Sequence, residues 1–126
     1  MNNRYSYKDL EVWHLSISLA EQIYKLTRNF PREEKFGMIS QLRRSAISVS
    51  NNICEGKGRL TAGEFRNFLS IARGSSYEVN NLLELSLRLG YCKAEEQINL
   101  SELNDKISAM LFKLIQNIQM PKKNRP

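Results

Sequence analysis

Apolar residues recur three and four positions apart along four long segments, and this spacing restricts the chain to a helical fold. The segments cover residues 7–29, 31–56, 62–89 and 94–120. None of them shows the strict alternation that is typical of a strand. Because short connections place successive helices antiparallel, the sequence predicts an all-α, up-down-up-down four-helix bundle, a single domain over residues 1–120. A basic, disordered tail is predicted at residues 121–126.

Start signals mark the beginnings of three of these segments. In a capping box, a hydroxyl group and an acid three residues later bond the free N–H groups at a helix start. Ser6 with Asp9 and Thr61 with Glu64 have this spacing. Pro31 suits the first position of a helix, where its missing N–H costs nothing. These signals predict helices that start near residues 7, 31 and 62.

The composition is that of a globular protein with an excess of positive charge. The chain has 126 residues, of which 41% are hydrophobic, and a formal net charge of +6. The N-terminal segment lacks the apolar core of a signal peptide, and no apolar run approaches the roughly 18 residues of a membrane span. These features predict a cytoplasmic protein. Cys54 and Cys92 form no CxxC motif, so we expect two buried thiols.

The positive charge is concentrated in the middle of the chain and in the tail. Residues 1–40 carry a net charge of +1, residues 41–73 carry +4, and residues 74–118 carry −2. The tail adds +3 through Lys122, Lys123 and Arg125. This distribution is compatible with an anionic partner, but it does not identify one.

The most unusual stretch is QLRRSAISVSNNICEGKGR at residues 41–59, which places small polar residues inside a helical segment. If the second and third helices form a hairpin that turns near Leu60, facing residue numbers sum to about 120. This register pairs Ser45 with Ser75, Ala46 with Gly74, and Ser48 with Ala72. Small residues on both helices let two backbones approach closely, which favours a structural contact over a ligand site.

Four long motifs carry a family resemblance. Two of them are QLRRSAISVSNNICEG at residues 41–56 and EFRNFLSIARGSSYEVNNLLELSLRLGY at residues 64–91. The others are YKDLEVWHLSISLAEQIYKLT at residues 7–27 and FPREEKFGMISQLRR at residues 30–44. Together they resemble the 23S rRNA intervening-sequence protein family, also called the S23 or four-helix-bundle protein family. The resemblance covers nearly the whole chain except the tail. It departs from the family pattern at Cys54, where alanine is more usual.

The resemblance implies a bundle that assembles as a ring, commonly a pentamer. It also implies kinship with the accessory variability determinant protein of diversity-generating retroelements, a basic barrel that works with reverse transcriptase and nucleic acid. The residues give a separate reason to expect a homo-oligomer. The segments at 7–29 and 62–89 each carry two apolar stripes, which is more than one bundle core needs.

The sequence lacks the motifs that commonly mark an enzyme or a cofactor site. His14 is the only histidine, which excludes the paired Glu-x-x-His motifs of a di-iron bundle. Nothing in the sequence brings His14 to either cysteine, and there is no P-loop or GxGxxG motif. We therefore expect no catalytic residue, no cofactor and no metal site.

Two acidic residues, Glu55 and Glu78, stand in the most distinctive stretches. One interpretation is a polar functional site. The favoured interpretation is structural, in which each carboxylate pairs with a nearby arginine or caps backbone groups. Arg59 lies one helical turn from Glu55 and is the first candidate partner.

Basic residues and one tyrosine form the predicted nucleic-acid surface. Arg66, Ser70, Arg73 and Tyr77 share one face of the third helix at helical spacing. Arginines, hydroxyl groups and an aromatic ring suit phosphate contacts and base stacking, although an ordinary solvated face has the same composition. The residues predicted to contact RNA or DNA are Arg43, Arg44, Arg59, Arg66, Arg73, Tyr77, Lys122, Lys123 and Arg125.

Two functions therefore remain open from the sequence. The protein is either an oligomeric accessory factor that contacts RNA or DNA, or an oligomeric scaffold that binds another protein. No known DNA- or RNA-reading module is present, so we expect any nucleic-acid contact to be independent of sequence.

Overall fold

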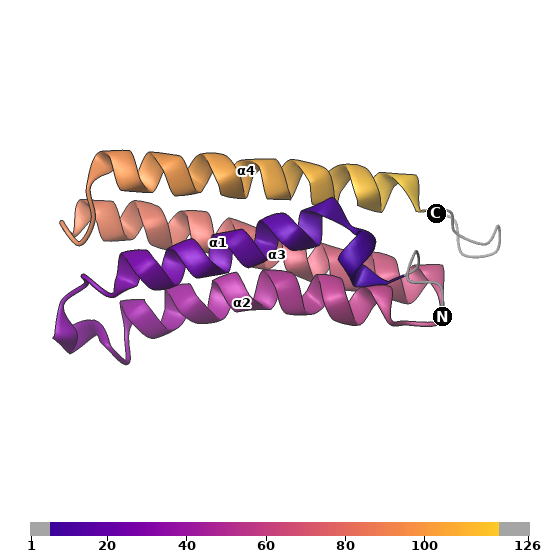
Figure 1. The fold of residues 1–126 in the computed structure, drawn as a ribbon, viewed down its shortest axis with the longest axis horizontal. Helices are drawn as coiled ribbons and strands as arrows, with labels where there is room; N and C mark the ends of the chain where they lie inside the picture. Colours follow the sequence, from indigo (N-terminus) through magenta and orange to yellow (C-terminus); the bar gives the residue numbers. More distant parts are fainter. Residues whose placement is uncertain (1–5, 119–126) are drawn as a thin grey trace.

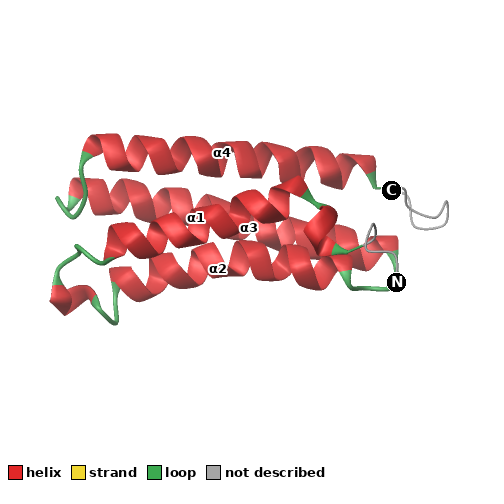
Figure 2. Ribbon diagram, in the orientation of Figure 1, coloured by secondary structure: helices red, strands yellow, loops and turns green. Residues whose placement is uncertain are grey.

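The computed structural model describes residues 6–118, which form a bundle of four long helices (Figure 1). The helices are α1 (Glu11–Thr27), α2 (Met38–Lys57), α3 (Ala62–Arg88) and α4 (Ala94–Asn117). Each runs antiparallel to the one before it, and contacts join α1 to α2, α2 to α3, α3 to α4 and α4 to α1. Within residues 6–118 there is no strand (Figure 2). The all-α four-helix bundle is confirmed, and the tail predicted at residues 121–126 lies outside the described residues.

The first long helix begins later than the sequence predicted. A short 3₁₀ helix, η2 (Tyr7–Asp9), precedes α1. The Ser6 hydroxyl accepts the Lys8 N–H at 3.0 Å and so caps this short turn instead of an α-helix. Apolar spacing alone does not reveal such a turn, because its stability comes from a local bond between a side chain and the backbone.

The second long helix also begins later than Pro31, where the sequence placed its start. Pro31 leads into another 3₁₀ helix, η3 (Arg32–Glu34), and α2 starts at Met38. The Glu34 carboxylate accepts the Met38 N–H at 3.0 Å. This bond satisfies one of the free backbone donors at the start of α2, so the cap of α2 comes from the preceding turn.

Both ends of α3 have regular caps. The Thr61 hydroxyl accepts the Glu64 N–H at 3.1 Å, which confirms one half of the predicted capping box. The Glu64 carboxylate accepts a bond from the Thr61 hydroxyl at 3.0 Å instead of from the Thr61 N–H. At the other end Gly90 has a φ of +79°, and the Tyr91 N–H bonds the Ser86 carbonyl at 2.9 Å. This is a Schellman motif, in which a left-handed glycine turns the chain and satisfies the last carbonyl groups.

The core is built from one apolar stripe of each helix. Its largest fully buried side chains include Leu19, Ile23, Leu42, Ile53, Leu69, Leu83, Ile107 and Leu111. The second apolar stripe of α1 packs against the margin of this core through Leu10, Trp13 and Ala20. The second stripe of α3 differs, because Ile71 and Leu85 are 46% and 42% exposed. Part of this stripe of α3 is therefore left uncovered in a single chain.

Small residues of α2 and α3 do meet, although not in the predicted pairs. Ser45, Ala46 and Ala72 are buried. The Ser48 and Ser75 hydroxyl groups are hydrogen-bonded at 2.8 Å, whereas the predicted partner of Ser48 was Ala72. The register of the two helices is thus shifted by about one turn from a hairpin centred on Leu60.

The predicted close approach of Ala46 to Gly74 is wrong. Gly74 is exposed, and a Cβ atom added to it would meet nothing within 4 Å. The close approach occurs at Gly56, a buried glycine near the end of α2, where an added Cβ would lie 2.7 Å from the Cβ of Phe68. Phe65 also lies against Gly56, so two aromatic residues of α3 cover this glycine.

Candidate nucleic-acid interface

The flank between α3 and α4 brings three of the sequence-predicted residues together. Arg73 donates through Nη2 to the Tyr77 hydroxyl at 3.1 Å, and its guanidinium carbon lies 5.0 Å from the centroid of the Tyr77 ring. Arg66 lies two helical turns before Arg73 on the same face of α3. The sequence reasoning missed Phe112 of α4, whose ring centroid also lies 5.0 Å from the guanidinium carbon of Arg73. In the sequence, Phe112 is marked only as a large aromatic residue outside the core stripe of its helix.

Arg66 and Arg73 each carry an unsatisfied donor. The Nε atoms of both side chains are shielded from solvent, and neither has a hydrogen-bond partner within residues 6–118. Leaving such a shielded donor without a partner costs about 1–3 kcal/mol.

Cations also lie on aromatic rings at the turn between α2 and α3. The guanidinium carbon of Arg59 is 4.7 Å from the Phe68 ring centroid, and Nζ of Lys57 is 5.4 Å from the Phe65 ring centroid. A ring attracts a cation through its quadrupole but does not neutralise its charge. These residues therefore keep a full positive charge for an external partner.

The other two predicted arginines of the described chain lie elsewhere. Arg43 faces α1, where its Nε donates to the Thr27 hydroxyl at 2.9 Å and its guanidinium carbon lies 4.3 Å from the Tyr24 ring centroid. Arg44 is exposed on α2. The structure therefore separates Arg43 from Arg66 and Arg73. The predicted contacts Lys122, Lys123 and Arg125 lie outside the described residues.

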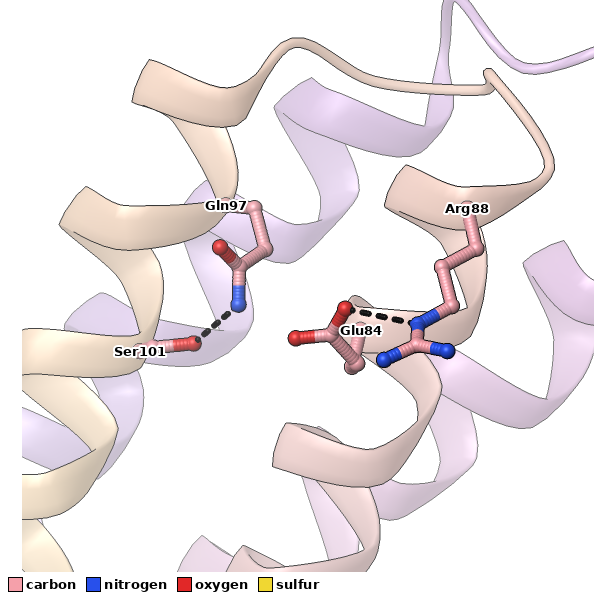
Figure 3. Close-up of polar contacts among 4 residues, drawn as sticks. All are labelled: Glu84, Arg88, Gln97 and Ser101. Carbon is pink, nitrogen blue, oxygen red and sulfur yellow. Dashed lines mark hydrogen bonds and ion pairs between the residues drawn. The ribbon is translucent and has the colours of Figure 1, made fainter.

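Glu55 and Glu78 are both exposed. The predicted pairing with arginine is not found for either of them within residues 6–118, and Arg59 lies on the Phe68 ring instead of beside Glu55. The ion pair that does occur joins Glu84 to Arg88 on the last turns of α3, at 3.1 Å (Figure 3). Both of its side chains are exposed, so it contributes little to stability.

Positive charge is unequal between the two ends of the bundle. The end with the α2–α3 turn also holds the start of α1 and the end of α4 (Figure 1). This basic half, residues 6–19, 48–75 and 106–118, has seven basic and four acidic residues, a net charge of +3. The opposite half, residues 20–47 and 76–105, has eight basic and nine acidic residues, a net charge of −1.

The opposite half is tied together by a tyrosine and a carboxylate. The Tyr91 hydroxyl donates to Glu34 at 2.6 Å, and the Tyr91 and Phe30 ring centroids are 5.5 Å apart. The bond from Tyr91, followed by the bond from the Met38 N–H, lowers the pKa of Glu34 below its usual value. The same bond to Glu34 raises the pKa of Tyr91.

Histidine and cysteine side chains are scattered along the bundle. His14 is exposed, and its Nε2 atom lies 2.8 Å from the Lys8 carbonyl oxygen. Cys54 and Cys92 are half-buried, which is less than the sequence predicted, and burial raises the pKa of the Cys92 thiol. Over the described range 6–118, no three His, Cys, Asp or Glu side chains are grouped to hold a metal ion. The helices of that range are also too polar or too short to cross a membrane.

The chain is similar to one family and to a solved structure. A model of the 23S rRNA-intervening sequence protein family matches residues 8–113. A protein of unknown function from the S23 ribosomal protein family of Bacteroides thetaiotaomicron shares 28% sequence identity and superposes with a TM-score of 0.76. That similarity covers 84% of this chain and 99% of the other. No curated protein matches the chain. Because the family model spans nearly all of the bundle, the chain belongs to the 23S rRNA-intervening sequence protein family.

Proposed function

We propose that the protein is a non-enzymatic, oligomeric accessory factor that contacts RNA or DNA through the basic half of the bundle. The observation that carries the proposal is the environment of Arg59 and Arg73, which lie on aromatic rings in a half with a net charge of +3. Phosphate groups are suitable partners for such arginines, because a guanidinium donates two parallel hydrogen bonds to them. Contacts of this kind fix position without reading sequence.

Self-association would strengthen these contacts. Each copy in an oligomer repeats the same +3 half, so the positive fields add and weak phosphate contacts gain from multivalency. Ile71, Leu85 and Leu89 supply an interface, because they lie on the outward side of α3 and are 46%, 42% and 50% exposed. We expect a homo-oligomer, and the family resemblance favours five copies.

Light scattering on the full chain tests the assembly. We expect a mass several times that of one chain at micromolar concentration, and Ile71→Gln with Leu85→Gln should lower it. A monomeric wild-type protein would contradict self-association. The exposed stripe of α3 would then favour the second candidate function, a scaffold that binds another protein through this face.

Nucleic-acid binding is tested by fluorescence anisotropy with labelled RNA and DNA at low and moderate salt. Affinity should fall linearly on a log–log plot against salt, because binding releases counterions from the phosphates. Arg66→Gln with Arg73→Gln should weaken binding and reduce the slope of this plot by about 2, one for each phosphate that is no longer neutralised.

The matched control is Arg88→Gln, which removes an arginine from the same helix in the opposite half. Arg88 already pairs with Glu84, so we expect its loss to leave affinity and salt slope unchanged. Wild-type protein that binds neither RNA nor DNA at low salt would overturn the proposed function. Equal losses for the Arg88 and the Arg66/Arg73 variants would show that the basic half has no special role.

A further inference from the structure

A continuous groove follows the flank between α3 and α4 in and beside the basic half. Three adjoining hollows form it, of which the middle one has a volume of about 430 Å³. The middle hollow shares Arg73, Tyr77 and Phe112 with one neighbour and Ser70 and Ile115 with the other. Its size falls within the roughly 300–1,000 Å³ of pockets that hold small ligands, and a flexible strand can follow its length.

The groove offers aromatic faces to an incoming ligand. Tyr77 is 58% exposed and Phe112 is 47% exposed, and each ring centroid lies 5.0 Å from the guanidinium carbon of Arg73. A planar, electron-poor ring system can stack on such a surface, and every nucleobase has a face that does so regardless of sequence.

Charge along the groove is polarised. Arg66 lines one end, and Arg73 lies about 10 Å along the helix axis from it, at 1.5 Å per residue. Asp105 lines the other end and accepts a bond from Asn80 at 2.7 Å. Phosphates are therefore favoured toward Arg66 and disfavoured near Asp105.

We infer that this groove binds an unpaired segment of RNA or DNA, with bases stacked on Tyr77 and Phe112 and phosphates held by Arg66 and Arg73. The inference rests on the proposed function and adds a preference for single strands. A duplex keeps its base faces stacked inside the helix, so it can use the arginines but not the rings. Single strands should therefore bind more tightly than duplexes of the same length.

The test compares single-stranded and duplex RNA and DNA of matched length in anisotropy titrations of the full chain. Tyr77→Leu with Phe112→Leu keeps apolar side chains and all charges but removes both rings, together with the Tyr77 hydroxyl that bonds Arg73. Loss of one or two stacked bases should weaken single-strand binding by at least about tenfold. Duplex affinity and salt slope should not change. The control is Phe36→Leu, which removes a ring that is 89% exposed in the opposite half.

A second variant tests the inference even if the first variant does not fold. Phe112→Trp keeps a ring in the groove, and base stacking on the new indole should quench its emission when single strands, but not duplexes, are added. Equal wild-type affinity for single strands and duplexes, or an unchanged affinity in the Leu variant, would overturn the inference and leave the proposed function standing. Wild-type protein that binds no nucleic acid would overturn both.

Discussion

The two ends of the bundle hold their charged side chains in different ways. In the opposite half, Arg88 pairs with Glu84, and Glu34 accepts bonds from Tyr91 and from the Met38 N–H. Arg43 of that half lies on the Tyr24 ring and also donates to the Thr27 hydroxyl. In the basic half, Arg59 and Arg73 lie on aromatic rings. A carboxylate partner neutralises a cation, whereas a ring only orients it. The two halves therefore differ in the carboxylate partner of Arg88 and in net charge, which is −1 in the opposite half and +3 in the basic half.

The difference also appears in the packing near each end. The opposite half closes with hydrogen bonds, at the Schellman turn of Gly90 and between Tyr91 and Glu34. The basic half closes by packing Phe65 and Phe68 over Gly56. Phe65 and Phe68 pack α2 against α3, and the same two rings hold Lys57 and Arg59. These residues therefore contribute both to stability and to the position of the positive charge.

The largest loss of stability should come from filling the close contact at Gly56 in the basic half. Gly56→Leu places a side chain where even a Cβ lies 2.7 Å from the Cβ of Phe68. Overpacking of this kind costs about 1–3 kcal/mol or more, which thermal or urea unfolding should detect.

The control is the same substitution on the facing helix, Gly74→Leu, where the added Cβ meets nothing within 4 Å. Replacing an exposed glycine inside a helix should raise stability by about 0.5–1 kcal/mol. An unchanged melting temperature for Gly56→Leu would show that aromatic packing does not close the basic half.

A smaller loss of stability is expected from a substitution of Asn104, which lies where the two halves meet. Asn104 is fully buried on α4, and its amide donates to the Ser76 carbonyl at 2.7 Å while its oxygen accepts the Ser76 hydroxyl at 2.7 Å. Asn104→Ala leaves the buried Ser76 hydroxyl without its acceptor at 2.7 Å and should cost about 1–3 kcal/mol in the free energy of unfolding.

Removal of both polar side chains in Ser76→Ala with Asn104→Leu should recover part of this loss. The bonds also hold α3 and α4 in the register that sets Phe112 beside Arg73. A double variant no more stable than Asn104→Ala would contradict the idea that an unsatisfied Ser76 hydroxyl causes the loss.

Tyr91→Phe should have a modest effect that depends on pH and is confined to the opposite half. Because the fold lowers the pKa of Glu34, the bond stabilises the protein above the usual glutamate pKa and is lost as pH falls through the lowered value. Because the fold raises the pKa of Tyr91, the stabilisation is present below the usual tyrosine pKa and lost as pH rises through the raised value.

Melting temperatures of wild type and Tyr91→Phe should therefore differ most near neutral pH and converge in acid. Glu34→Gln should not be used as the matching variant, because it also alters the cap of Met38. A constant difference from acid to neutral pH would mean that the Glu34 carboxylate is not the partner that matters.

The smallest effect is expected for Arg88→Gln. The Arg88 and Glu84 side chains are 77% and 49% exposed, and an exposed pair four residues apart in a helix contributes about 0.3–0.5 kcal/mol. Salt screens such a pair, so the difference in unfolding free energy should vanish at high salt. A loss above about 1 kcal/mol that survives high salt would mean that Arg88 has a structural role.

The sequence by itself determined the number and the approximate extent of the helices. Apolar periodicity, the Thr61 cap and the start of the fourth helix near residue 94 are local properties, since helical spacing and capping involve residues a few positions apart. The placement of Arg66, Arg73 and Tyr77 on one face of α3 was predictable for the same reason. The family resemblance was also carried by contiguous motifs, and the family model confirms it.

Only the tertiary structure decided which residues of different helices meet. Gly56 rather than Gly74 became the point of closest approach, Arg43 turned to α1, and Phe112 of α4 joined Arg73. These outcomes depend on how far each helix rotates and slides against its neighbours, which the packing of large side chains from both helices sets together. A pattern along one helix fixes which side faces inward, but it does not fix which residue of the next helix lies opposite.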